Sequence, residues 1–156
     1  MLVTLPKLLT NAASTASLIS PNPLPSISEK AQVNLLKSPD FTGDANILSE
    51  VTYNETKYKV TSIDENAFMD CSSLVSITIP NSVKYIGNYA FEDCTSLNKI
   101  IISNSVKSIG ESAFIGCNSL TSITIPYSVK YIDKYAFWSC VNIKSIISNA
   151  TTPPKL

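Results

Sequence analysis

Apolar residues recur at fixed positions between Val60 and Ala150. The pattern repeats every 23 residues, in copies that begin at Val60, Val83, Val106 and Val129. Each copy runs through Val, Ile, Ala-Phe, Cys, Leu or Ile, and Ile, with polar residues between them. Self-similarity at such a period is typical of a solenoid, in which each unit buries its apolar face only against its neighbours. We therefore expect a stack of coils around one continuous core.

Each repeat predicts two short extended segments joined by a compact turn. Residues 74–79 alternate and are rich in β-branched side chains, which indicates a strand with Ile77 and Ile79 pointing inward. Residues 83–86 predict a second extended segment on the opposite side of the coil. Residues 65–70 predict one tight helical turn, with Ala where backbones approach and Phe in the middle of the coil. The fold class is therefore an α/β-type solenoid dominated by short parallel β-strands.

The chain divides into four zones. Residues 1–30 are rich in Ser, Pro, Ala and Asn and predict a flexible leader or linker, with some features of a degenerate signal segment. Residues 31–59 predict an N-terminal β cap, residues 60–150 the four repeats, and residues 151–156 a C-terminal tail.

Both ends of the stack need caps. Residues 51–53 and 57–60 are β-rich runs on either side of a turn, and they predict a hairpin that leads into the first repeat. Shorter strands are expected at residues 32–36 and 45–48. The degenerate fourth repeat and the tail around Pro153 are expected to cap the C-terminal end of the stack.

Composition excludes several functions. The chain has 12 basic and 12 acidic residues, and every basic residue is a lysine. Nucleic-acid binding usually relies on clustered Lys and Arg, so it is not expected. The chain has no histidine, which removes the commonest general base and a major zinc ligand. No catalytic or phosphate-binding motif occurs, and no apolar run is long enough to span a membrane. We therefore expect no enzymatic activity, cofactor, metal or membrane span.

The repeat V-x-x-I-x-x-x-A-F-x-x-C-x-x-L-x-x-I-x-I-P-x-S resembles the BspA-type leucine-rich repeat. The departures are few: Ser103 and Asn149 replace the proline, and Ile143 and Ser148 vary the last strand. The resemblance implies a right-handed leucine-rich repeat coil and a secreted or cell-surface location. It also implies a non-enzymatic module for protein binding or adhesion, with a protein or glycan on a host or neighbouring cell as partner. The alternative is a structural spacer, or a fragment of a longer surface array.

The resemblance also implies a binding surface, because in leucine-rich repeat proteins the strand sheet lines the ligand-facing side. The outward residues of the four predicted strands are then the candidates, and we call them the strand face. They are Val75, Ser76, Thr78, Asn98, Lys99, Ile101, Thr121, Ser122, Thr124, Lys144, Ser145 and Ile147. A solvated Ser/Thr-rich β face would have the same composition. Exposed apolar groups such as Ile101 and Ile147 favour an interface.

Four cysteines fall one repeat apart, at Cys71, Cys94, Cys117 and Cys140. A metal or redox ladder would use such a column. However, the spacing is not C-x-x-C, and no His or acidic cluster accompanies it. Free cysteine often behaves as a small buried hydrophobe, so we expect a buried structural column.

Three further features have structural interpretations. Lys84, Lys107 and Lys130 form a column that predicts a solvated face rather than an anion site. Trp138 is expected to pack on the terminal cap, with an exposed anchor as the alternative. The motifs at Asn54 and Asn149 permit glycosylation only where the host glycosylates secreted proteins.

Four coils spaced about 4.8 Å apart span only roughly 15–20 Å along the stack. Such a footprint is smaller than a standard stable interface. We therefore expect a monomer that binds weakly at one site and gains strength through multivalency.

Overall fold

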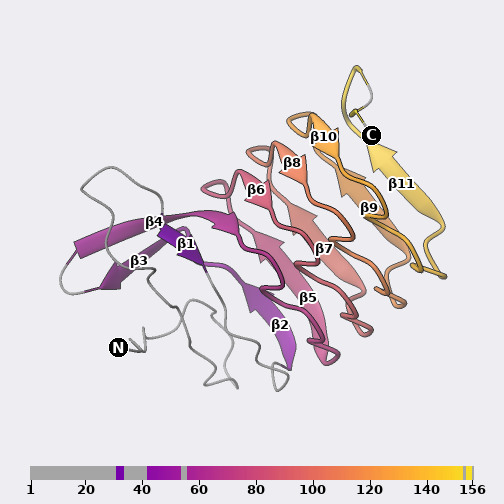
Figure 1. The fold of residues 1–156 in the computed structure, drawn as a ribbon, viewed down its shortest axis with the longest axis horizontal. Helices are drawn as coiled ribbons and strands as arrows, with labels where there is room; N and C mark the ends of the chain where they lie inside the picture. Colours follow the sequence, from indigo (N-terminus) through magenta and orange to yellow (C-terminus); the bar gives the residue numbers. More distant parts are fainter. Residues whose placement is uncertain (1–30, 34–41, 54–55, 153, 156) are drawn as a thin grey trace.

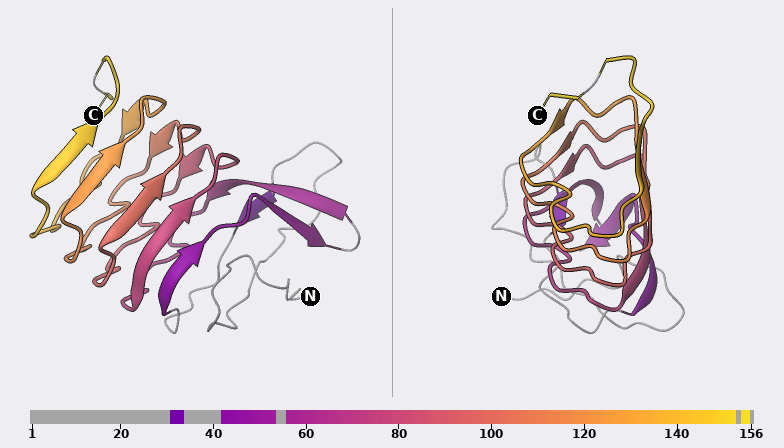
Figure 2. Two further views of the ribbon diagram at one scale, coloured as in Figure 1. Left: turned by 180° about the vertical axis from the view of Figure 1, so that it is seen from behind. Right: turned by 90° about the vertical axis from the view of Figure 1, so that its right-hand side faces the viewer.

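The computed structural model describes residues 31–33, 42–53, 56–152 and 154–155. The described chain winds into a β-solenoid of about four coils, stacked along one axis (Figures 1 and 2). The expectations for residues 1–30 and for glycosylation at Asn54 lie outside the described residues. The zone boundaries drawn from the sequence stay a prediction.

One side of the coils carries a row of parallel strands, the back row. It consists of β1 (Ala31–Val33), β4 (Thr56–Ile63), β6 (Tyr85–Ile86), β8 (Ser108–Ile109) and β10 (Tyr131–Ile132). From β4 onward each strand pairs with the next at the repeat spacing, for example Tyr85 with Ser108 and Ser108 with Tyr131. The second extended segment predicted in each repeat is therefore confirmed.

The opposite side carries the front row. It consists of β2 (Gly43–Asn46), β5 (Leu74–Ile79), β7 (Lys99–Ile102), β9 (Ser122–Ile125) and β11 (Ser145–Ser148). Parallel ladders join β2 to β5 and β5 to β7, and another joins β9 to β11. β7 and β9 lie side by side, but they belong to different sheets in the described part of the chain. The strand predicted at residues 74–79 is confirmed.

The N-terminal side combines a hairpin with an additional pair of strands. β3 (Glu50–Tyr53) pairs with β4 antiparallel, as the sequence predicts, and this hairpin projects away from the stack (Figure 1). β1 and β2 instead continue the two rows, because both pair in parallel with the first full coil. The side chains of Ala45 and Ile47 are buried there. It is therefore β2 and the residue that follows it, rather than the projecting hairpin, that carry these buried side chains beside the first full coil.

The helical turn predicted in each repeat is wrong, since no helix occurs in the described residues. In the first coil Asn66 and Asp70 have φ of 59° and 61°, which a right-handed helix does not permit. The amides of Asn66, Phe68 and Asp70 donate instead to carbonyls of the next coil, at 2.7–3.0 Å. These long-range hydrogen bonds replace the i to i−4 bonds of a helix.

Four phenylalanine rings form a stacked column through the middle of the coils. Phe68 and Phe91 lie 5.0 Å apart, Phe91 and Phe114 5.2 Å, and Phe114 and Phe137 5.5 Å, with ring planes within 7°. Phe91 and Phe114 are fully buried, whereas Phe137 is half-buried. The last ring thus has a neighbouring ring on one side only.

The inward columns are buried in the first coils but not throughout. Ile77 and Ile123 are 1% and 2% exposed, as expected for core residues. Ile100 is half-buried, at the place where the front row changes sheets. Ile146, in the same column, is 50% exposed. The expectation that this column is buried is therefore wrong for the last coil, because among the described residues β11 has a neighbouring strand on one side only.

The four cysteines are free and buried, in agreement with a structural column. Each thiol after the first donates a hydrogen bond to a phenylalanine carbonyl of the preceding coil. The pairs are Cys94 Sγ to Phe68 O at 3.1 Å, Cys117 Sγ to Phe91 O at 3.2 Å and Cys140 Sγ to Phe114 O at 3.0 Å. The cysteine column therefore links neighbouring coils through side-chain hydrogen bonds as well as packing.

Alkaline pH is expected to destabilise the fold through these thiols. Burial raises the pKa of Cys71 from 9.0 to about 11, and it raises the pKa of Cys94, Cys117 and Cys140 as well. The folded chain keeps its thiols protonated at pH values where those of the unfolded chain ionise. The contribution of the thiols to the free energy of unfolding is therefore fully present below pH 9. The free energy of unfolding should fall between pH 9 and about 11, by about 1.4 kcal/mol per pH unit for each affected thiol.

Urea unfolding at successive pH values measures this dependence. Cys117→Ala should show a shallower loss than the natural sequence over the same range. Equal slopes for the two proteins would contradict the assignment of the alkaline loss to the thiols.

Candidate functional site

The strand face lies along one side of the solenoid, on β5, β7, β9 and β11 (Figure 1). The alternation of each strand fixes the direction of its side chains, since every second residue points into the core. In β9, Ile123 and Ile125 are buried while Ser122 and Thr124 are exposed. The ladders between β5 and β7 and between β9 and β11 keep equivalent positions aligned from coil to coil.

Ten of the twelve predicted residues of the strand face are exposed, and Ser76 and Thr78 are half-buried. Ser76 donates a hydrogen bond to Asp44 of β2 at 2.6 Å, so its hydroxyl is already engaged. Three apolar side chains stand out from this polar surface. They are Val75, Ile101 and Ile147, which are 36%, 48% and 51% exposed.

The charged groups of the strand face are two lysines on different coils. Lys99 begins β7, and Lys144 directly precedes β11; both side chains are exposed. No carboxylate lies within salt-bridge distance of either lysine in the described part of the chain. Asp44, on β2, is the acidic residue that adjoins this surface. The surface therefore combines hydroxyl groups, exposed branched aliphatic side chains and positive charge.

The lysine column of the back side is also open to solvent. Lys107 and Lys130 are exposed, and Lys84 is half-buried with its Nζ 3.5 Å from the Asn81 carbonyl. Glu111 forms its salt bridge with Lys134 of the turn at 3.2 Å rather than with this column. Within the described ranges no carboxylate pairs with Lys84, Lys107 or Lys130, as expected for a solvated face.

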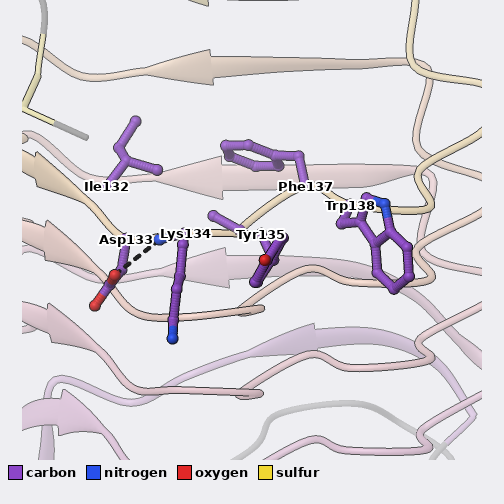
Figure 3. Close-up of a pocket in the computed structure, with 7 residues that line it drawn as sticks. Ile132, Asp133, Lys134, Tyr135, Phe137 and Trp138 are labelled. Atoms are coloured by element: carbon purple, nitrogen blue, oxygen red, sulfur yellow. Dashed lines mark hydrogen bonds between the residues drawn. The ribbon is translucent and has the colours of Figure 1, made fainter.

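A shallow hollow of about 360 Å³ lies on the last coil, between residues 132 and 138 (Figure 3). Ile132 and Phe137 point to one side of the backbone there, and Lys134 and Trp138 point to the other. Asp133 accepts a hydrogen bond from the Lys134 amide at 2.8 Å. The lining is almost entirely apolar, and no pair of groups is placed for acid–base chemistry.

Trp138 does not pack on a cap, so that prediction is wrong. Its side chain is 64% exposed, and its ring makes a tilted contact with Tyr135, with centroids 6.0 Å apart. Sequence reasoning also missed the hollow itself. The one signal was that Trp138 replaces the smaller Met69, Glu92 and Ile115 at the same position of the other coils.

No group of three or more His, Cys, Asp or Glu side chains could hold a metal ion in the ranges that the structure describes. Those same ranges contain no helix that is long and apolar enough to cross a membrane.

The geometry thus defines a parallel β-solenoid with an extended strand face. The sequence profile of the BspA type leucine-rich repeat region matches residues 41–153, in six copies. The chain therefore belongs to the BspA-type leucine-rich repeat family. Proteins of leucine-rich repeat families typically bind proteins or act as structural elements. A comparison with curated proteins gives no match.

Solved structures with a similar fold are bacterial leucine-rich repeat proteins. One from Bacteroides capillosus is 32% identical with a TM-score of 0.66, and the match covers 77% of this chain and 87% of that chain. One from Bacteroides ovatus is 32% identical with a TM-score of 0.58, covering 80% of this chain and 38% of that one. The T. pallidum leucine-rich repeat protein is 26% identical with a TM-score of 0.52, covering 70% and 65%. The chain thus spans less than two thirds of the length of the last two.

Proposed function

We propose that this chain is a non-enzymatic binding module that contacts a protein or glycan through its strand face, outside the cell. The observation that carries the proposal is the contrast within each coil. The inward columns repeat almost unchanged, whereas the outward positions Val75, Asn98, Thr121 and Lys144 differ from coil to coil. Packing explains the constant columns, and a recognition surface explains variation in an exposed row that the fold holds in register.

The chemistry of the strand face supports this role. Ile101 and Ile147 expose about half of their surface on a sheet that is otherwise rich in hydroxyl groups. Exposed aliphatic groups beside unpaired lysines give a surface that can bury apolar area and attract a negatively charged partner. The small span of the array indicates weak binding by a single copy and gain through multivalent display.

A charge-reversal experiment tests the assignment of the face. The purified chain, displayed in many copies on beads, is offered to a panel of extracellular-matrix proteins and to a glycan array. Lys99→Glu combined with Lys144→Glu should weaken any interaction seen with the natural sequence by about tenfold, since each reversal replaces an attractive charge by a repulsive one.

The matched control reverses two lysines of the back side, Lys107→Glu with Lys130→Glu. Both double variants change the net charge equally and place one substitution in the last coil, so a nonspecific charge effect would weaken both. Equal losses, or a loss confined to the back-side variant, would reject the strand face. Absence of binding to every panel member would favour the alternative role of a structural spacer.

A further inference from the structure

The front row is interrupted between the second and third coils, at a place that we call the seam. The seam separates β7 from β9, because no ladder joins these two strands although they lie side by side (Figure 1). In the steps on either side, the Asn98 amide donates to the Val75 carbonyl at 3.0 Å and the Lys144 amide to the Thr121 carbonyl at 2.8 Å. The equivalent bond from the Thr121 amide to the Asn98 carbonyl is absent from the described residues. The strand face therefore has a break in hydrogen bonding near its middle.

The interruption is confined to the front row. Behind it, β6 pairs with β8 in register, and the Phe91 ring stacks on Phe114 at 5.2 Å with ring planes 2° apart. The Phe91 amide also donates to the Ala113 carbonyl of the next coil, at 2.8 Å. The two coils are thus held together at the back and in the core. The seam belongs to the front surface and not to an end of the stack, since a coil lies on each side of it.

Apolar side chains are accessible at the seam. Ile100 is half-buried, whereas Ile77 and Ile123 hold the same position in the neighbouring coils and are almost completely buried. Ile101 is 48% exposed on the strand face. The neighbouring coils hold threonine at its position, at Thr78 and Thr124. The seam therefore combines an accessible core residue with an aliphatic side chain where the adjacent coils have a hydroxyl group.

A positive charge borders these two isoleucines. Lys99 begins β7 with an exposed side chain, and no carboxylate lies within salt-bridge distance of it in the described ranges. Thr121 and Ser122 are exposed on the other side of the seam. A ligand at the seam thus meets aliphatic groups, one cation and hydroxyl groups.

The strand face contains no aromatic residue, since its strands β5, β7, β9 and β11 consist of aliphatic, hydroxyl and lysine side chains. Exposed aromatic side chains lie elsewhere on the described chain, at Tyr85, Tyr127, Tyr131, Tyr135 and Trp138. Sugar rings pack their C–H faces on aromatic rings, and the strand face does not offer that contact. Branched aliphatic groups beside a lysine fit the side chains of a protein better than the ring of a sugar.

We propose that the seam is the centre of recognition on the strand face and that its ligand is an extended segment of a protein. This assignment rests on the binding role proposed for the strand face. A branched aliphatic side chain of the segment packs on Ile100 and Ile101, and a neighbouring carboxylate pairs with Lys99. The main chain of the segment supplies donors and acceptors to β7 and β9, which no ladder joins to each other. Central, partly enclosed residues dominate binding in most protein interfaces, and the seam provides such residues.

Selection from a phage-displayed library of random peptides on the immobilised full chain tests the proposal. We expect enriched peptides to combine a branched aliphatic residue with Asp or Glu, and to bind as synthetic peptides in fluorescence polarisation. Ile101→Thr should raise their dissociation constant about tenfold, because it removes the apolar anchor. It inserts the residue found at Thr78 and Thr124, so the thermal midpoint should be unchanged.

Ile147→Thr is the matched control, because it makes the same substitution in the same column at similar exposure, 51%, away from the seam. It should raise the dissociation constant by only about twofold. Val141→Ser removes an apolar side chain that is 74% exposed on the turn of the last coil, and it should leave binding unchanged. Equal weakening by Ile101→Thr and either of the other variants would overturn the seam as the centre of recognition.

The remaining outcomes separate the seam from the proposed function. Enrichment of no peptide would overturn the protein segment as ligand, and a glycan bound through Lys99 and Lys144 would then still support the strand face. Peptides whose binding depends on Lys107 and Lys130 instead of Lys99 would reject the strand face itself.

Discussion

Phe91→Ala is expected to lower the free energy of unfolding by about 4 kcal/mol, since truncation of a buried phenylalanine costs about 3–5 kcal/mol. The Phe91 ring is completely buried, and it stacks on Phe68 at 5.0 Å and on Phe114 at 5.2 Å. Alanine would leave a cavity in the middle of the stack that neither ring can fill without separating the coils. Urea unfolding followed by circular dichroism measures the change.

Phe137→Ala is the matched control for this prediction. Phe137 is half-buried and stacks on Phe114 alone, at 5.5 Å. The same substitution should therefore cost about half as much, because only one side of the cavity is enclosed. Losses of equal size at the two positions would show that the stack does not depend on burial between two coils.

Gly110→Ala is expected to destabilise the fold by about 3 kcal/mol, at the upper end of the usual cost of overpacking. A Cβ at this position would lie 2.7 Å from the amide nitrogen of Asn88 and 2.7 Å from the carbonyl carbon of Gly87. Both atoms belong to the backbone of the preceding coil, so relief requires the two coils to move apart. Gly87 has the same constraint, with Asp64 and Glu65 backbone atoms at 2.7 Å.

Gly116→Ala separates this clash from the conformational preference of glycine. Gly116 has φ of +71°, and its nearest neighbour is the side chain of Asp93, which can rotate away. Alanine there should cost about 1–2 kcal/mol, the usual penalty for a left-handed residue. Thermal unfolding of both variants checks the order, and a larger loss for Gly116→Ala would contradict close backbone packing at Gly110.

The repeat period was sufficient to predict the two rows of strands and the core columns. Those features depend on local alternation and on residues that recur, as Ile77 and Ile123 do. The turn was predicted wrongly, because its amides bond to the next coil and its left-handed residues include Tyr89 and Tyr135. Tyrosine is not a residue that usually signals such a conformation.

The close contact at Gly110 also escaped sequence reasoning. Its column contains Asp64, Gly87, Gly110 and Asp133, so it showed no uniform glycine. The direction of the strand face followed from alternation. The exposure of apolar side chains on the last coil did not, because periodicity shows which side chains point inward and not whether a neighbour covers them. Ile146 has the sequence pattern of a core residue and the exposure of a surface residue.

Recognition through the strand face is the central claim, and hydroxyl-radical footprinting tests it most directly. The chain carries exposed reporters at three places: Val75 and Ile101 on the front, Tyr85 and Tyr131 on the back, and Trp138 on the turn of the last coil. With a binding partner from the matrix or glycan panel, the account predicts protection of Val75 and Ile101 and unchanged modification of both tyrosines. Protection of Tyr85 and Tyr131, with Val75 and Ile101 still fully modified, would contradict it.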